Sequence, residues 1–187
     1  MRMPLIIRNQ RGVTLIEVLV TVIILSIGLL GMAGLQSRLQ QSEMEAYQRS
    51  QALMLLNDMA NRIASNRSNA ATYVTGAASP LGAGMTCPDN TGSRAQRDAS
   101  EWCAALQGAA ETSGGSSVGA MVGGRGCVES LASNQYLVTV AWQGLTPISA
   151  PPAGAACGAN SYGPAGSTCA DDVCRRVVTT IVRVATL

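Results

Sequence analysis

The side chain with the clearest chemical interest is Glu17, which is the only formal charge in the apolar run of residues 13–35. A helix of this length reaches roughly 30 Å or more, enough to cross the hydrocarbon of a bilayer. A carboxylate in such a segment is costly unless a partner or a function compensates it. The run is therefore predicted to span a membrane, and its one carboxylate requires a reason.

Two interpretations of Glu17 are open. In the first, the side chain lies near the helix end, where it reaches the interface or stays protonated. In the second, the chain is cut after Gly12, so that Val13 gains an α-amine on the same helix face as the carboxylate. A free amine at a helix start is unfavourable beside the positive end of the macrodipole, and the Glu17 of a neighbouring copy could neutralise it.

Residues 12–18 resemble the type IV prepilin motif. Proteins of that family carry a short basic leader that ends in Gly, then a hydrophobic residue, then Thr-Leu-Ile-Glu-Val. This chain has matching residues at Gly12, Val13, Thr14, Leu15, Ile16, Glu17 and Val18. The resemblance implies that prepilin peptidase cleaves between Gly12 and Val13 and methylates the α-amine of Val13. It also implies that Glu17 contacts the N-terminus of an adjacent subunit during filament assembly. Val13 departs from the Phe that is usual in that family.

The leader, residues 1–12, is basic because it contains Arg2, Arg8 and Arg11. The positive-inside rule therefore predicts that it lies in the cytoplasm and that the chain after residue 35 lies outside. An ordinary signal peptide fits less well, because its apolar core has about 7 to 15 residues and no acid inside it.

The composition argues against two classes of function. The chain has thirteen Arg and eleven acidic residues, and three of the Arg lie in the leader, so a nucleic-acid partner is not expected. It has no His, which removes the commonest general base and the commonest metal ligand. We therefore expect neither an enzyme nor a bound cofactor or metal.

All six cysteines lie beyond the apolar run, and an even number on the exported side predicts a disulfide framework. Six cysteines allow fifteen arrangements, so the connectivity stays open. The pairing that we prefer has two local loops of similar length and one bond from the start of one strand to the start of the last: Cys87 with Cys103, Cys157 with Cys169, and Cys127 with Cys174. A zinc site at Cys169 and Cys174 is disfavoured by the spacing and the oxidising compartment.

The apolar helix is predicted to continue through residues 36–66, which contain no Pro or Gly and many good helix formers. Apolar residues recur there at three- and four-residue spacing, so this half is expected to be amphipathic. We expect it to bury part of that stripe against a sheet: Leu53, Leu56, Ala60 and Ile63.

The remaining residues, 67–187, predict a small antiparallel sheet. Residues 136–143 alternate between two faces, residues 177–184 are mostly β-branched, and residues 127–131 are a third candidate strand. A short helix is expected at residues 102–106, with a capping box from Asp98 to Glu101 and with Trp102 in the core. Residues 113–126 predict a loop with at most one strand near residues 118–122, and residues 146–170 a long loop. The fold class is α+β, with a pilin-like arrangement of a long helix on a sheet with disulfide-pinned loops.

Two further segments are similar to minor pilins of the PilV type: residues 25–36 (LSIGLLGMAGLQ) and residues 57–67 (NDMANRIASNR). The similarity is good over about the first 67 residues and loose beyond them. It implies a minor pilin that primes assembly of the type IV pilus and enters the fibre at or near its tip, supporting twitching motility and adhesion.

The resemblance also implies partners and a location. The expected partners are other minor pilins, the major pilin, prepilin peptidase, the inner-membrane assembly platform, the lipid bilayer and a tip adhesin. The expected location is the inner membrane, in a single pass with a periplasmic C-terminal domain, and then the pilus at the cell surface. The alternatives are a type II secretion pseudopilin, a major pilin and, less in keeping with the residues, a periplasmic enzyme on a signal anchor.

Overall fold

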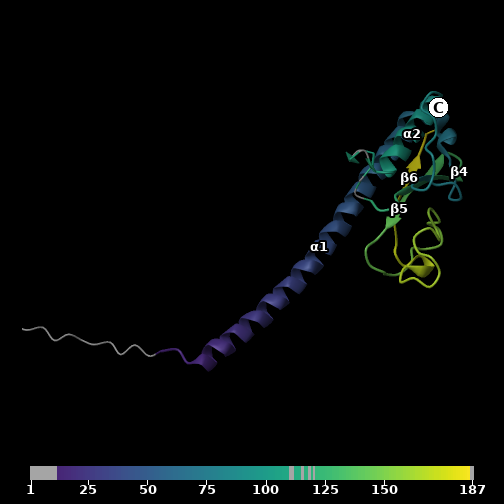
Figure 1. Cartoon of the computed structure of the whole chain (residues 1–187). Helices are drawn as coiled ribbons and strands as arrows, with labels where there is room; N and C mark the ends of the chain where they lie inside the picture. Colours follow the sequence, from purple (N-terminus) through teal and green to yellow (C-terminus); the bar gives the residue numbers. More distant parts are fainter. Residues whose placement is uncertain (1–11, 110–111, 115, 118, 120, 186–187) are drawn as a thin grey trace, which may run out of the picture. The chain divides into compact units, whose positions relative to one another are not determined.

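The computed structural model describes residues 12–109, 112–114, 116–117, 119 and 121–185 (Figure 1). Of the expected leader, only Gly12 falls within this part. The chain divides into two compact units, Met1–Ser42 and Glu43–Leu187. Helix α1, Leu15–Ser65, contributes to both units and corresponds to the long helix expected at residues 13–66.

The described part of the first unit, residues 12–42, is mostly the apolar part of α1. Its large apolar side chains from Leu15 to Leu35 are between 46% and 84% exposed, so the helix has no core of its own here. Within the described chain, α1 is the one helix long and apolar enough to cross a membrane. An all-round apolar helix of this kind needs lipid or other helices around it.

The second unit is an α+β domain, as predicted. Its main sheet is antiparallel in the order β1-β4-β5-β6, and its helices and remaining strands complete the domain. The bounds of the elements are η1 Arg67–Tyr73, β1 Leu81–Gly82, α2 Arg94–Leu106, β2 Thr112–Ser113, β3 Ser116–Ser117, β4 Arg125–Ala132, β5 Gln135–Gln143, η2 Ala170–Asp172 and β6 Arg175–Arg183.

The core lies between α1, α2 and one face of this sheet. Alternate residues of β5 point into it, with Val138 and Val140 fully buried, and α1 contributes Leu56 and Ile63. Leu53 was expected to be buried as well, but it is 40% exposed. The buried stripe of α1 runs through Ala52, Leu56, Met59 and Ile63. Leu53 follows Ala52 directly, so its side chain is rotated by about 100° around the helix axis and points away from the core.

Helix α2 is held between α1 and β4 through Trp102, which is fully buried as predicted. The indole Nε1 donates a hydrogen bond to the carbonyl of Leu55 on α1 at 2.9 Å. Its ring lies directly over Gly126 of β4, where a Cβ would come within 2.2 Å of the ring. Glycine at that position is what allows α2 to approach the sheet.

The start and the capping box predicted for α2 were wrong. Helix α2 begins eight residues before the predicted start, with a capping box between Ser93 and Gln96, so Asp98 and Glu101 lie inside the helix. Both four-residue segments, 93–96 and 98–101, fit the capping pattern. The earlier one forms the cap, because the carboxylate of Asp98 accepts a hydrogen bond from Arg62 of α1 instead. The predicted strand near residues 118–122 includes Val118 and Ala120, which lie outside the described residues; β2 and β3 form a small hairpin just before it.

The three main strands were predicted close to their observed bounds, as β4, β5 and β6. Of the preferred disulfides, Cys87–Cys103 is confirmed. The other two bonds are Cys127–Cys157 and Cys169–Cys174, so both remaining pairings were wrong.

The strand register explains the correction. Cys127 lies opposite Thr139, and Thr139 lies opposite Thr179 of β6. Cys174 precedes Thr179 by five residues, which is roughly 17 Å along an extended strand. A disulfide needs Cα atoms within about 7 Å, so Cys127 and Cys174 cannot meet. Cys127 instead reaches Cys157, which leaves Cys169 to its near neighbour Cys174.

Candidate processing and assembly site

The predicted scissile bond lies just ahead of α1. Gly12, Val13 and Thr14 are exposed and non-helical. A Cβ built on Gly12 would have no neighbour within 4 Å among the residues that the structure describes. Exposed, irregular backbone is the preferred substrate of peptidases, so the Gly12–Val13 bond is open to hydrolysis.

The helix begins with two hydrogen bonds to Thr14. Its carbonyl accepts from the backbone N–H of Glu17 at 3.1 Å and from that of Val18 at 3.3 Å. Glu17 therefore lies in the first turn, where the positive end of the helix macrodipole favours a negative charge. Val13 and Glu17 are four residues apart in the sequence, and Gly12 directly precedes Val13.

The polar side chains deeper in the apolar run are satisfied by their own helix. The hydroxyl of Thr21 donates to the carbonyl of Val18 at 2.8 Å, and the hydroxyl of Ser26 donates to that of Val22 at 2.7 Å. For the carboxylate of Glu17, by contrast, the described residues provide neither a hydrogen bond nor an ion pair. Any group that compensates this charge must come from elsewhere.

The comparison with protein families gives a match at this site. The prokaryotic N-terminal methylation motif matches residues 7–33, a short part of the chain that includes Gly12, Val13 and Glu17. This match supports a type IV pilin or a pseudopilin, and the α+β fold with a long N-terminal helix is pilin-like. No curated protein and no solved structure was found to match the chain.

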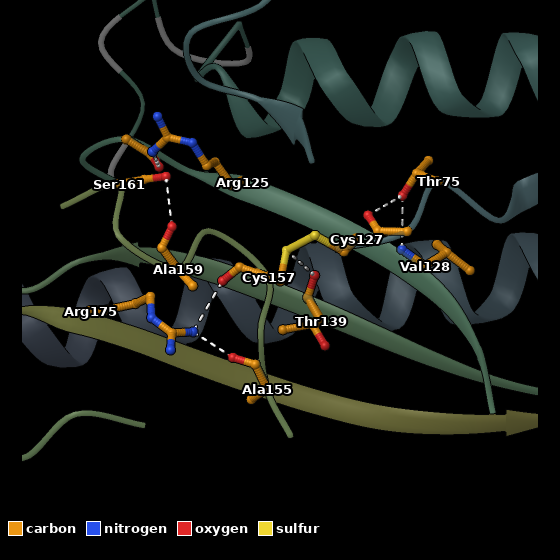
Figure 2. Close-up of a disulfide and its surroundings, with 12 residues drawn as sticks. Thr75, Arg125, Cys127, Val128, Thr139, Ala155, Cys157, Ala159, Ser161 and Arg175 are labelled. Atoms are coloured by element: carbon orange, nitrogen blue, oxygen red, sulfur yellow. Dashed lines mark hydrogen bonds between the residues drawn. A yellow bond between two sulfur atoms is a disulfide. The ribbon is translucent and has the colours of Figure 1, made fainter. Parts of the chain in front are cut away.

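A second group of residues fixes the loop that follows β5. Figure 2 shows the Cys127–Cys157 disulfide joining this loop to β4. The buried guanidinium of Arg175 donates through Nη1 to the carbonyls of Ala155, at 2.5 Å, and of Cys157, at 3.1 Å. Its Nε lies 3.1 Å from a carboxylate oxygen of Asp172. One covalent bond and one buried cation therefore hold the loop against the sheet.

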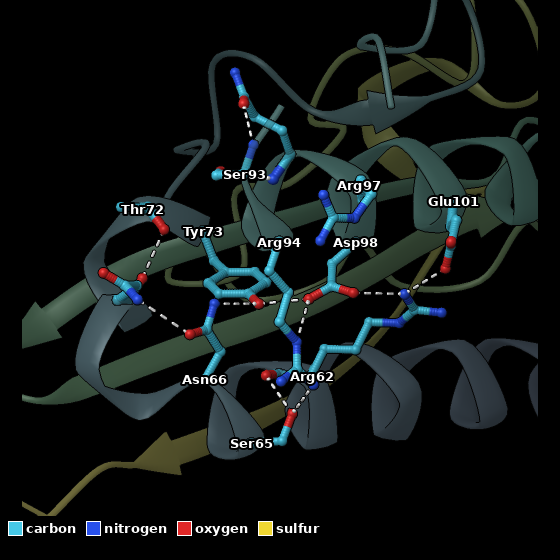
Figure 3. A network of polar contacts seen from close by, with 12 residues as sticks. Arg62, Ser65, Asn66, Thr72, Tyr73, Ser93, Arg94, Arg97, Asp98 and Glu101 are labelled. Atoms are coloured by element: carbon cyan, nitrogen blue, oxygen red, sulfur yellow. Dashed lines mark hydrogen bonds and ion pairs between the residues drawn. The ribbon is translucent and has the colours of Figure 1, made fainter. Parts of the chain in front are cut away.

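A third group joins α1 to α2 through Arg62 (Figure 3). Its guanidinium lies 2.8 Å from a carboxylate oxygen of Asp58, 2.9 Å from one of Asp98 and 2.7 Å from one of Glu101. Burial acts to lower the pKa of Arg62, but the three carboxylates outweigh it, and the net effect raises the pKa above its ordinary value.

The same network extends to Tyr73 of η1. Its hydroxyl donates to Asp98 at 2.5 Å and accepts from the side-chain amide of Asn66 at 3.0 Å. Burial raises the pKa of Tyr73, the hydrogen bond to Asp98 adds to that effect, and the bond from Asn66 opposes it. The phenol therefore stays protonated through the whole physiological range.

The sequence did not predict this network of Arg62, Asp98 and Tyr73. One signal was available, because Asp58 and Arg62 have the i,i+4 spacing of a helical ion pair. The contacts to Asp98 and Glu101 span 36 and 39 residues and leave no local pattern. Among the described residues, no group of three or more His, Cys, Asp or Glu side chains could hold a metal ion.

Proposed function

We propose that this chain is a minor pilin of the PilV type, which primes assembly of the type IV pilus and is incorporated at or near the fibre tip. In that role it supports twitching motility and adhesion. Its partners would be other minor pilins, the major pilin, the assembly platform and a tip adhesin. Before assembly it would lie in the inner membrane, with its C-terminal domain in the periplasm.

The observation that carries the proposal is the isolated carboxylate of Glu17 within a matched methylation motif. Hydrolysis of the Gly12–Val13 bond by prepilin peptidase would give Val13 an α-amine, which is then methylated. That amine is cationic and lies at the positive end of the helix, where a cation is unfavourable. The Glu17 carboxylate of an adjacent subunit would neutralise it in the apolar filament interior, where charge pairing is strong.

The exposed apolar side chains of the first unit support the same arrangement. They would contact lipid before assembly and the helices of other subunits afterwards. The three disulfides support an oxidising location for the second unit, as the positive-inside rule also indicates for the chain after residue 35.

Irregular, cross-linked loops support placement at a tip. The segment between β5 and β6 contains no regular element except η2, and two disulfides hold it in place. A surface of this kind suits a terminal position better than a wall of repeating subunits, because a repeating wall requires the same contact at every subunit.

Deletion of the gene followed by complementation tests the proposal. The wild-type chain and the Glu17→Ala variant would be compared for surface pili, twitching and secretion of exoproteins. Loss of pili with normal secretion, restored by the wild type and not by the variant, supports a minor pilin. Loss of secretion with normal pili identifies a type II secretion pseudopilin instead and contradicts the proposal.

A further inference from the structure

The sheet of the second unit has an outer face, which points away from the core, and the loop after β5 covers only part of that face. Strand β5 alternates, so Val138 and Val140 face the core while Leu137, Thr139 and Ala141 face outward. The loop that follows β5 covers the outer side chains at one end of the sheet. A Cβ built on Gly158 would lie 3.4 Å from the Cβ of Ala141, and the Sγ of Cys157 lies 3.9 Å from the carbonyl oxygen of Thr139.

The other end of this face is open. In the register of the sheet, Glu129 of β4 lies beside Leu137 of β5, and Leu137 lies beside Ile181 of β6. Ile181 is a large apolar side chain on the edge strand β6, at the end of this row, and it is 50% exposed. Arg183, also exposed, lies two residues further along β6, opposite Gln135. We call Glu129, Leu137, Ile181 and Arg183 the open patch.

The two charges of the open patch lack partners in the described structure. Glu129 is half-buried, and its Oε2 has neither solvent access nor a hydrogen-bond partner among the described residues. No ion pair to Arg183 is formed by any residue that the structure places. One carboxylate oxygen of Glu129 is withdrawn from water without a cation beside it, which is unfavourable, so a cation that reaches the other oxygen over this end of the sheet would stabilise the group.

The arrangement of these charges is self-complementary. One anion lies on β4, one cation lies on β6, and apolar side chains lie between them. A two-fold axis in the plane of the patch, passing midway between Glu129 and Arg183, exchanges the two positions. A second copy related by that axis brings a cation to each Glu129 and an anion to each Arg183, which is the form of an isologous interface.

We propose that the open patch binds a second copy of this chain, with Glu129 of each protomer paired to Arg183 of the other and Leu137 and Ile181 packed between them. The interface uses the outer face of the sheet, while residues 43–65 of α1 pack on the inner face. It therefore does not disturb the packing of this part of α1 on the sheet. The pairing would apply equally to a pseudopilin, so it does not depend on the proposed function.

Site-specific photo-crosslinking in cells tests this pairing on the full chain in its own membrane. A photo-reactive amino acid replaces Ile181, and the same residue at Val122, which is 49% exposed elsewhere on the domain, is the control. We expect a product of twice the mature mass, composed of this chain alone, from position 181 and not from position 122. A product with a different protein, or no product from position 181, overturns the proposal.

Charge reversal sharpens the test. Glu129→Arg and Arg183→Glu each place like charges across the interface, and each should lower the yield of the dimer by roughly tenfold or more. The double variant restores both ion pairs between protomers and should restore the yield. Arg67→Glu, at an exposed position outside the patch, should leave it unchanged.

Folding is checked separately, by resistance of the disulfide-bonded domain to protease, which should be equal in all these variants. A dimer that tolerates both single reversals contradicts the charge pairing. So does a double variant that stays monomeric while its domain remains folded.

Discussion

Two charged side chains on the same helix have opposite surroundings. Arg62, near the end of α1, is contacted by three carboxylates from α1 and α2. Glu17, in the first turn of α1, has no counter-charge in the part of the chain that the structure describes. The described residues thus supply the partners of Arg62 and supply none for Glu17.

This difference indicates that the two parts of α1 have different roles, one in folding and one in assembly. The second unit has a buried core of its own, three disulfides, and partners for the charge of Arg62. In the described part of the first unit, α1 exposes its apolar side chains, and the carboxylate of Glu17 has no partner there. Changes to Arg62 should therefore act on folding, and changes to Glu17 should act on assembly.

The largest effect is expected from Glu17→Gln, which keeps the shape of the side chain and removes its charge. The amine of a neighbouring subunit would then be left unpaired in an apolar interior, so incorporation into surface filaments should be almost abolished. Thermal unfolding of the second unit should not change. Glu43→Gln, at an exposed position of the same helix, is the matched control. If the Glu17 variant is incorporated into filaments normally, then Glu17 does not act in assembly, and its contrast with Arg62 is wrong.

The next largest effect is expected from removal of a disulfide in the second unit. Cys127 and Cys157 are 30 residues apart, and the chain-entropy model gives about 3.5 kcal/mol for a loop of that length. Cys169 and Cys174 are only 5 residues apart, and the same model gives about 2 kcal/mol. Paired Cys→Ala variants of the two bonds, compared by chemical denaturation in detergent, should keep this order. The reverse order would mean that native packing, rather than loop length, sets the contribution of each bond.

A smaller loss of stability is expected from Arg62→Met. The change leaves the largely buried carboxylate of Asp98 without its cation, and it should lower the free energy of unfolding by about 2 kcal/mol. Arg49→Met, on an exposed face of the same helix, should change it little. If the two variants unfold at the same temperature, then the network around Arg62 does not stabilise the domain.

The smallest effect concerns alkaline pH. Because burial and Asp98 raise the pKa of Tyr73 in the folded state, this group stabilises the domain fully below the pKa of an unfolded tyrosine, about 10. The stabilisation is lost as the pH rises through the higher pKa of the folded state. Tyr73→Phe should therefore flatten the decline of the unfolding temperature above about pH 10. Part of the decline should remain, since burial also raises the pKa of Tyr162.

Local patterns in the sequence predicted the elements of the fold. The alternation of side chains between two faces predicted β5, and the run of β-branched residues predicted β6. The absence of Pro and Gly from residues 36–66 predicted the length of α1. These signals depend only on neighbours in the chain. The start of α2 was misplaced because two tetrads fitted the same capping pattern, and only the tertiary contact of Asp98 with Arg62 distinguishes them.

Features that depend on distant pairing could not be predicted in this way. The partner of Cys127 is determined by which residue of the long loop reaches the outer face of β4, and the register of the sheet decides that. The exposure of Leu53 depends on a rotation of 100° about the helix axis, which approximate three- and four-residue spacing does not resolve. Glu17, by contrast, was identified from composition alone, because one charge in an apolar run needs no fold to be recognised.

The most direct measurement is the intact mass and N-terminal peptide of the chain isolated from its membrane. If Glu17 serves the amine of a processed subunit, the mature chain should begin at Val13, should lack residues 1–12 and should carry a methyl group on its α-amine. A chain that retains its basic leader would leave no such amine for the carboxylate to meet, and it would contradict the proposed role of Glu17.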